Sequence, residues 1–203
     1  MQAVSPVMNK KGTSDMDEPY NTVTDAAQAL RLLKEGNERY LREQLSDKGN
    51  YAEEREALAK GQRPFAVVLT CSDSRTPPEI FFDQKLGDLF TIRVAGNIAG
   101  PSCLGSIEYA VERLKTPLVV VAGHSECGAV IAAYRGAEAG GNLKIILDRI
   151  RSACGGSASE EDAIRDNIRH TVEQIRNNEV VARCRAVVAG AYYDIRSGVV
   201  SWR

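Results

Sequence analysis

Four short apolar runs, rich in β-branched residues, are the feature that most constrains how this chain can fold. They lie at residues 65–70, 89–92, 117–122 and 185–190. Continuous apolar runs of this length are typical of strands that are covered on both faces. Segments with helical periodicity separate them, and strands that alternate with helices indicate an α/β fold. We therefore predict a central, mostly parallel sheet of four to five strands, flanked by helices.

The helical segments carry their own start signals. Apolar residues at helical spacing predict an N-terminal helical arm that ends near Leu41, with Thr24 as its N-cap. A second, charged helix is predicted over residues 53–60. Ser157 and Glu160 have the spacing of a capping box and predict the start of a long helix late in the chain.

The two ends of the chain differ in character. Residues 1–22 are polar and contain proline and glycine, so we predict a flexible N-terminal arm followed by a single domain at 23–203. The last segment, 192–202, turns at Ser197-Gly198 and predicts a hairpin at one edge of the sheet.

The charge balance argues against some classes of partner. The chain has 26 Lys and Arg against 27 Asp and Glu, so no excess of positive charge favours nucleic acid or an anionic membrane. The longest apolar stretch, 118–123, is too short to span a bilayer. The first residues lack the charged-then-apolar order of a signal peptide, which predicts a cytoplasmic location.

Cysteine usage indicates free thiols. An odd number spread over a chain of this length is not a disulfide framework, so some thiols are available to bind a metal. Only two histidines, His124 and His170, are present. His170 falls in the middle of a predicted helix, where we expect a surface residue, and no proton shuttle is evident. The five cysteines are Cys71, Cys103, Cys127, Cys154 and Cys184.

Metal-binding residue types follow two of the predicted strands. Cys71 comes directly after the first apolar run, and His124 and Cys127 follow the third. Ligands in open α/β sheets bind at the carboxyl ends of strands, and zinc accepts thiolate and imidazole ligands. Each cysteine alone could be a small buried hydrophobic residue. Two cysteines and a histidine, each at a strand end, favour a zinc site with an open fourth position.

An acid and a guanidinium stand beside the first of these cysteines. Asp73 and Arg75 are close enough in sequence to pair and orient each other. Two thiolates make the zinc formally neutral, so its water is less acidified than under three imidazoles. Asp73 could accept a hydrogen bond from that water, with Arg75 holding it ionised. Alternatively, Asp73 could occupy the fourth zinc position and close the site. We expect the open form at neutral pH.

Four motifs stand in order along the chain: Cys71-Ser-Asp-Ser-Arg75, Gly87-Asp-Leu-Phe-Thr-Ile-Arg-Val-Ala-Gly-Asn97, Ser106-Ile-Glu-Tyr-Ala-Val111 and Gly123-His-Ser-Glu-Cys-Gly128. Together they resemble the beta carbonic anhydrases. The resemblance covers about residues 24–203 and implies zinc on Cys71, His124 and Cys127, with Asp73 and Arg75 beside it. It also implies reversible hydration of carbon dioxide to bicarbonate and a proton, by attack of zinc-bound hydroxide.

The same resemblance implies a substrate pocket and an assembly. Gln62 matches a substrate-positioning glutamine, and Phe90 and Tyr109 match positions that line an apolar pocket for carbon dioxide. We expect Ala95 to line the same pocket. In the family Gln62, Phe90 and Tyr109 come from the neighbouring subunit, which implies a homodimer or a dimer-based tetramer whose N-terminal helices embrace the partner. Tyr109 also lies off the apolar stripe of its predicted helix, as a residue at a partner surface would.

The chain departs from the family pattern at one site. Some members bind bicarbonate at a non-catalytic site built from a tryptophan, an arginine and a tyrosine. Arg93 and Tyr193 match the last two, but Val68 stands at the tryptophan position, which puts this regulatory site in doubt.

Other functions fit the same residues. Carbon disulfide and carbonyl sulfide hydrolases resemble this family closely, and the sequence does not show the tunnel that would distinguish them. A structural zinc, closed by Asp73, would suit a scaffold or a bicarbonate-sensing protein. A thiol-redox role is disfavoured because the chain has no Cys-x-x-Cys pair.

Overall fold

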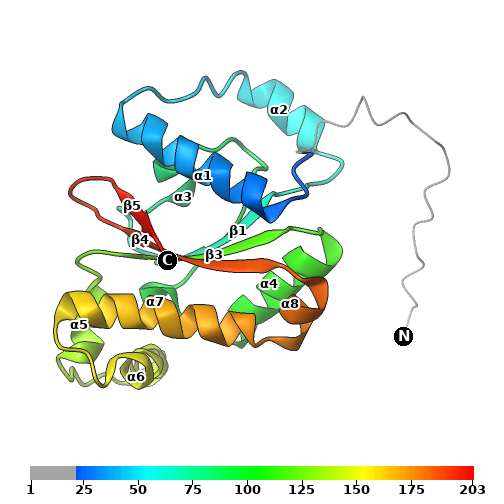
Figure 1. The fold of residues 1–203 in the computed structure, drawn as a ribbon. Coiled ribbons are helices and arrows are strands. Elements are labelled where there is room, and N and C mark those ends of the chain that lie inside the picture. Colours follow the sequence, from blue (N-terminus) through cyan, green and yellow to red (C-terminus); the bar gives the residue numbers. More distant parts are fainter. Residues whose placement is uncertain (1–21) are drawn as a thin grey trace.

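A computed structural model describes residues 22–203 as one five-stranded sheet with helices on both faces (Figure 1). The predicted arm at 1–22 therefore lies, apart from its last residue, outside the described residues. The strand order is β2-β1-β3-β4-β5; the first four strands are parallel and β5 is antiparallel to β4. Both the mostly parallel sheet and the hairpin edge are confirmed. The strands are β1 (Ala66–Thr70), β2 (Leu89–Arg93), β3 (Leu118–His124), β4 (Val187–Tyr193) and β5 (Val200–Trp202).

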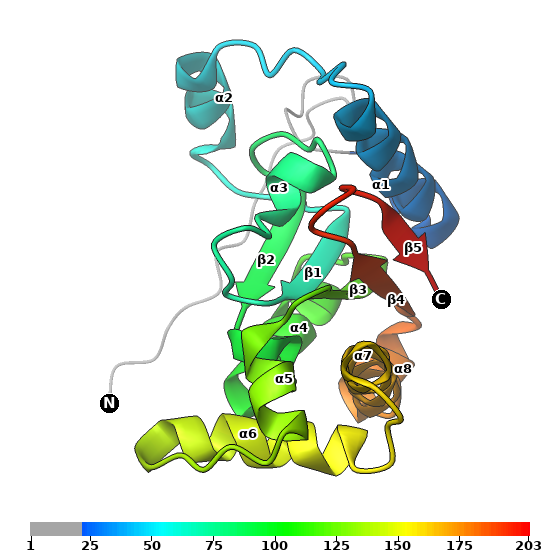
Figure 2. The same cartoon turned by 90° about the vertical axis from the view of Figure 1, so that its left-hand side faces the viewer.

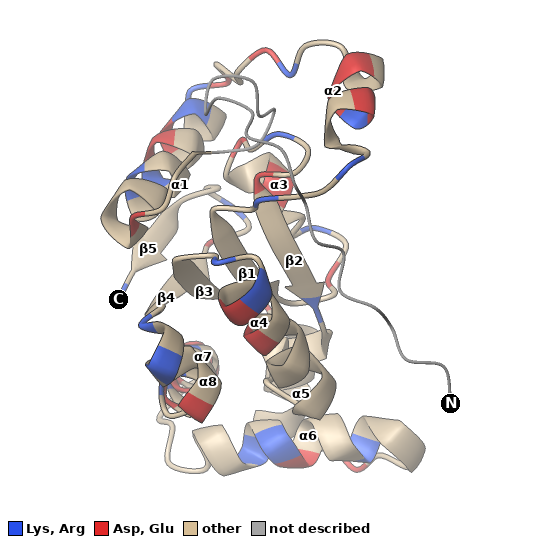
Figure 3. Cartoon of the chain, turned by 90° about the vertical axis from the view of Figure 1, so that its right-hand side faces the viewer, with Lys and Arg blue, Asp and Glu red and all other residues tan. Residues whose placement is uncertain are grey.

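The central strands are apolar throughout because both of their faces are covered. Every residue of β1 and β3 is buried, and successive residues alternate between two cores. Val67 and Leu69 belong to the core on one face, whereas Ala66 and Val68 belong to the core on the other. Figure 3 shows the lysines, arginines, aspartates and glutamates gathered on the helices and loops around these strands.

The helices are divided unequally between the two faces. α1, α2 and α3 lie on one side of the sheet, and α4 to α8 lie on the other (Figures 1 and 2). Within residues 22–203, no helix combines the length and apolar character needed to cross a bilayer. The helices are α1 (Ala26–Leu41), α2 (Tyr51–Leu58), α3 (Pro78–Phe81), α4 (Pro101–Arg113), α5 (Gly128–Tyr134), α6 (Gly141–Cys154), α7 (Glu160–Arg176) and α8 (Glu179–Cys184), with a 3-10 turn η1 (Ala95–Asn97).

Two predicted helix caps were wrong by one or two residues. The carboxylate of Asp25, rather than Thr24, accepts the hydrogen bond from the first turn of α1. Ser159, rather than Ser157, caps α7, and the Ser157 hydroxyl bonds to Asp166 at 2.7 Å instead. In both places two capping residue types stand close together, and the chain's entry angle decides between them.

On helix α7, which packs on β3 and β4, one isoleucine lies against glycines of both strands. A Cβ atom at Gly123 would lie 2.5 Å from the Ile168 side chain, and one at Gly190 would lie 3.1 Å from it. The two glycines therefore leave a socket in the sheet that Ile168, itself buried, fills.

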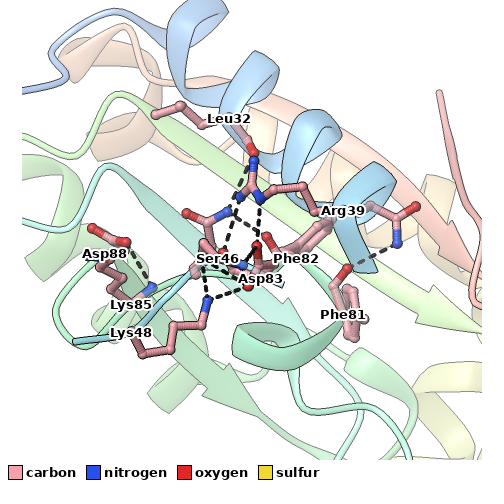
Figure 4. A network of polar contacts seen from close by, with 11 residues as sticks. Leu32, Arg39, Ser46, Lys48, Phe81, Phe82, Asp83, Lys85 and Asp88 are labelled. Atoms are coloured by element: carbon pink, nitrogen blue, oxygen red, sulfur yellow. Dashed lines mark hydrogen bonds and ion pairs between the residues drawn. The ribbon is translucent and has the colours of Figure 1, made fainter. Parts of the chain in front are cut away.

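A buried carboxylate joins α1, α3 and the segment between α1 and α2 (Figure 4). The Asp83 side chain is fully buried and accepts hydrogen bonds from Arg39 Nε at 2.6 Å and from the Ser46 amide and hydroxyl at 3.0 and 3.1 Å. Lys48 forms a second ion pair with it. A buried charge is tolerated only when it is paired and hydrogen-bonded, and here both conditions hold. Asp83 therefore anchors the segment that leads to α2, none of whose residues is buried.

The charge of Asp83 makes the stability of the fold sensitive to acid. Burial alone would raise the pKa of this carboxyl, but the contacts from Lys48, Ser46 and Arg39 outweigh it and lower the pKa to about 2. Because the folded pKa lies below the unfolded value, this contribution is complete above about pH 4 and is lost as the pH falls through about 2.

We expect Asp83→Asn to lower the free energy of unfolding at pH 7 by about 3 kcal/mol, because two cations lose their buried partner. Urea unfolding measured from pH 7 down to pH 2 should show the gap between the two proteins shrinking below pH 4. Asp148→Asn, which removes an exposed carboxylate paired with Lys144 and Arg151, is the control and should change stability little. A gap that stays constant down to pH 2 would contradict this account of Asp83.

Candidate metal centre

The order of the strands brings the candidate metal ligands together at one edge of the sheet. The chain passes from β1 to β2 on one side and then returns to β3 on the other side of β1. Loops that leave the carboxyl ends of β1 and β3 therefore diverge, and ligands bind at such a point in open α/β sheets. Cys71 directly follows β1, His124 is the last residue of β3, and Cys127 is the N-cap of α5.

The three side chains meet in the interior. The sulfur atoms of Cys71 and Cys127 are 3.9 Å apart, and the three ligand atoms all lie within 4.8 Å of one another. All three residues are buried, with at most 5% of any of them exposed. Across the described residues this is the one such group of histidine, cysteine or acidic side chains that could hold a metal ion.

The histidine is oriented as a ligand. Its Nδ1 lies 2.8 Å from the carbonyl oxygen of Ser125, so Nδ1 carries the proton and donates it to that oxygen. Nε2 is buried and has no hydrogen-bond partner among the described residues. Buried polar atoms are almost always satisfied, and a second hydrogen bond that fixes the tautomer is typical of metal-binding histidines. The unpartnered Nε2 therefore fits a metal ion.

The two thiols lie within hydrogen-bonding distance, and each affects the ionisation of the other. The hydrogen bond from Cys127 outweighs burial and, with contacts from His124 and the Gly96 amide, lowers the pKa of Cys71 to about 4. The same hydrogen bond, with burial, raises the pKa of Cys127. A divalent cation between them would balance the charge of both sulfurs as thiolates, the form in which cysteine binds metals.

Asp73 and Arg75 form a close pair beside the three ligands. Arg75 donates from Nε at 2.9 Å and from Nη2 at 2.7 Å to the two carboxylate oxygens of Asp73. Its backbone amide donates to the same carboxylate at 2.9 Å. Arg75 therefore holds the pKa of Asp73 well below its usual range, although burial opposes it. The carboxylate of Asp73 faces Arg75 and is not part of the metal-binding group.

Arg93 and Tyr193 are engaged in contacts of their own. Arg93 Nε donates to the carbonyl oxygen of Cys71 at 3.0 Å, and its Nη2 donates to that of Asp73 at 2.5 Å. The Tyr193 hydroxyl lies 3.3 Å from that of Tyr40. Arg93 thus supports the loop that carries Cys71 and Asp73.

The predicted pocket residues fall into two groups. Ala95 lies in η1, next to the glycine whose amide contacts Cys71. Phe90 pairs with Val67, which lies four residues before Cys71. Phe90 and Cys71 are therefore about 13 Å apart along the strand direction. The Phe90 and Tyr109 rings are neighbours, with centroids 6.2 Å apart, and Tyr109 is 50% exposed. Gln62 is exposed and precedes β1, so neither it nor the ring pair lies at the carboxyl ends of the strands.

Two supporting residues were missed by sequence reasoning. The Gly96 amide donates to the Cys71 sulfur at 3.3 Å, and Asn167 Nδ2 donates to the Gly96 carbonyl oxygen at 2.8 Å. Asn167 lies in the buried stripe of α7, between Ile164 and Ile168. A polar residue inside an apolar stripe was the available signal, but its partner lies 71 residues away.

Comparison with known proteins assigns the family. The family model described as carbonic anhydrase matches residues 66–200, well over half of the chain. The carbonic anhydrase of Mycolicibacterium smegmatis is 35% identical over 189 residues, covering 86% of this chain and 92% of that protein. This chain belongs to the beta-carbonic anhydrase family.

Other similar proteins agree with this assignment. Carbonic anhydrase 2 of Mycobacterium tuberculosis is 44% identical over 131 residues, and that match spans 63% of either protein. The beta-carbonic anhydrase CafA of Aspergillus fumigatus has a TM-score of 0.68 at 29% identity, over 87% of this chain and 89% of that one. A tetrameric beta-carbonic anhydrase of Sordaria macrospora has a TM-score of 0.65 at 29% identity, over 72% and 84%.

For this beta-carbonic anhydrase family member, we expect about one zinc ion per chain after purification with zinc and gel filtration. Cys71→Ser should lose the ion and melt at a lower temperature, because a metal that binds only the folded state stabilises it. Cys103→Ser, which alters a half-buried cysteine outside the group, should keep both zinc and melting temperature. Elemental analysis and calorimetry give the two readouts; full zinc in Cys71→Ser would show that the metal lies elsewhere.

Proposed function

We propose that this protein is a zinc-dependent carbonic anhydrase, which interconverts carbon dioxide with bicarbonate and a proton. The observation that carries the proposal is the buried group of Cys71, His124 and Cys127, with the carboxylate of Asp73 held away by Arg75. Three protein ligands with an open fourth position are typical of catalytic zinc, whereas structural zinc has four. The cytoplasmic location stays a prediction from the sequence.

Zinc suits this set of donors. Two thiolates and one imidazole are the soft and borderline ligands that zinc prefers. The buried Nε2 of His124, which has no hydrogen-bond partner among the described residues, could bind the ion. When bound, zinc would supply the Lewis acid that activates water for attack on carbon dioxide.

Asp73 is the residue that we assign to orienting the attacking water. Its carboxylate is ionised and fixed in direction by three hydrogen bonds from Arg75. An ionised carboxylate accepts a hydrogen bond and thereby holds a water molecule in one orientation. Arg75 keeps Asp73 in this role by preventing it from swinging toward the metal ligands.

The rest of the pocket is assigned to two chains. Ala95 serves the site of its own chain, next to Gly96. Gln62, Phe90 and Tyr109 serve the site of a second copy, because within one chain they lie toward the amino ends of the strands. The exposed ring of Tyr109, packed beside Phe90, supports this assignment. The proposal therefore requires at least a homodimer.

The catalytic role of Asp73 is tested by stopped-flow carbon dioxide hydration with a pH indicator. We expect Asp73→Ala to lower kcat/KM by about 100-fold while the zinc content stays at the wild-type level. Asp148→Ala, an exposed carboxylate on α6, is the control and should retain full activity.

Two outcomes would redirect the assignment. If Asp73→Ala loses zinc and stability together, Asp73 is a fourth ligand and the zinc is structural. If the zinc-loaded wild type does not hydrate carbon dioxide, the proposed substrate is wrong, and carbonyl sulfide and carbon disulfide become the substrates to assay.

The shared pocket is tested by mixing two impaired variants. Cys71→Ala cannot bind metal, and Tyr109→Ala has an altered pocket. Refolded together, they should form mixed dimers in which one site joins an intact metal group to an intact pocket. Activity should recover to about a quarter of the wild-type value, because half of the dimers are mixed and each has one complete site. No recovery, with mixed dimers shown by mass spectrometry, would place Tyr109 in the site of its own chain.

A further inference from the structure

A cavity outside the metal centre lies where the segment that follows η1 meets α6 and α7. It has a volume of about 120 Å³ and is lined by Ile98 and Ala99, which follow η1, and by residues of α6 and α7. The Gly96–Ala99 segment separates the two sites, since the Gly96 amide contacts Cys71 on one side and the Ala99 backbone lines the cavity on the other. The lining residues are Ile98, Ala99, Arg149, Ser152, Asn167, His170, Thr171 and Gln174.

Arg149 is the one charged side chain among the described residues that line the cavity. Arg149 supplies a guanidinium and His170 an imidazole, and none of the described residues that line the cavity is Asp or Glu. The other lining side chains with polar atoms are neutral hydroxyls and amides. Asn167 and Thr171 are buried, at 1% and 2% exposed, so polar groups line the deep part of the cavity. Donors without a competing carboxylate are what an anion requires.

Arg149 differs from its neighbours on α6 and α7. Arg151, Arg165 and Arg169 each form an ion pair with a carboxylate on their own helix. Arg149 forms none with any described carboxylate, and its one hydrogen bond is a long one of 3.5 Å to the Ala99 carbonyl oxygen. A half-buried guanidinium without a counter-charge retains donors for a ligand.

The cavity walls are held in place before any ligand arrives. Asn167 donates to the carbonyl oxygen of Gly96 at 2.8 Å, and Gln174 Nε2 donates to that of Ala99 at 2.9 Å. These two bonds fix the loop to α7 from both ends. A preformed site binds more tightly, because less ordering is required on binding.

We propose that this cavity binds one small oxyanion, of the class that includes bicarbonate and orthophosphate. A volume of about 120 Å³ holds roughly four water molecules, or one ion of that size with its remaining waters. Arg149 is the charged partner, His170 lies at the rim, and Thr171 provides a hydroxyl. The site is distinct from the position of Arg93 and Tyr193, and it does not depend on the proposed catalytic function.

The test is a titration of the zinc-loaded, isotope-labelled protein, followed by amide NMR at constant ionic strength. Orthophosphate and bicarbonate are added separately, with chloride as the reference. We expect saturable shifts of the amides of Ala99 and Thr171. Arg149→Gln should weaken the apparent affinity by about tenfold or more, because a charge-assisted hydrogen bond is lost. Arg169→Gln, on the neighbouring helix α7 and already paired with Asp166, is the matched control and should bind as the wild type does.

The outcomes separate the possible ligands. Shifts with both anions support a general oxyanion site, and shifts with bicarbonate alone support a site for the reaction product. Thr171→Val, which removes only the hydroxyl, should also weaken binding of the anion. It is the test variant if Arg149→Gln does not fold. The proposal is overturned if neither anion shifts these amides, if shifts appear only beside Cys71 and His124, or if Arg149→Gln and Thr171→Val both bind as tightly as the wild type.

Discussion

Strands β1 and β3 lie side by side at the centre of the sheet and must be covered on both faces. Their backbones satisfy each other through parallel pairing, and helices cover both faces. Only the strand ends remain available for polar chemistry. The carboxyl ends of these two strands open into diverging loops, so the thiols and the imidazole can meet there without disturbing either core. The position of the metal group is thus a consequence of how the sheet is buried.

This constraint also explains what the sequence could reveal. Continuous apolar runs record burial on both faces, which is a local property, so the first four strands were predicted with boundaries that differ by at most three residues. The helix starts were less certain because Thr24 and Asp25 are both capping residues, as are Ser157 and Ser159. The anchor at Asp83 could not be predicted, because Arg39 and Lys48 are 44 and 35 residues away in the chain. Sequence spacing alone gives no sign of such a contact.

Some residues of the candidate site could likewise be predicted from the sequence, and others could not. Cys71, His124 and Cys127 could be grouped from the sequence because each stands at a strand end, and strand ends of a parallel sheet lie together. The support given by Gly96 and Asn167 could not, because it depends on how α7 sits against the sheet. The assignment of Gln62, Phe90 and Tyr109 to the pocket of a second chain came from the family resemblance. The hydrophobic periodicity of one chain does not predict contacts between two chains.

The glycine socket on the sheet has a consequence for the mechanics of α7. Because Ile168 fits between Gly123 and Gly190, the helix cannot slide along its axis without lifting that side chain out. A shift of one turn, about 5.4 Å, would also carry Asn167 away from Gly96 and leave the Cys71 loop unsupported. The contact of Ile168 with these glycines therefore fixes the position of α7 along the sheet. Two residues without side chains thus set the register of a helix on which the geometry of the metal ligands depends.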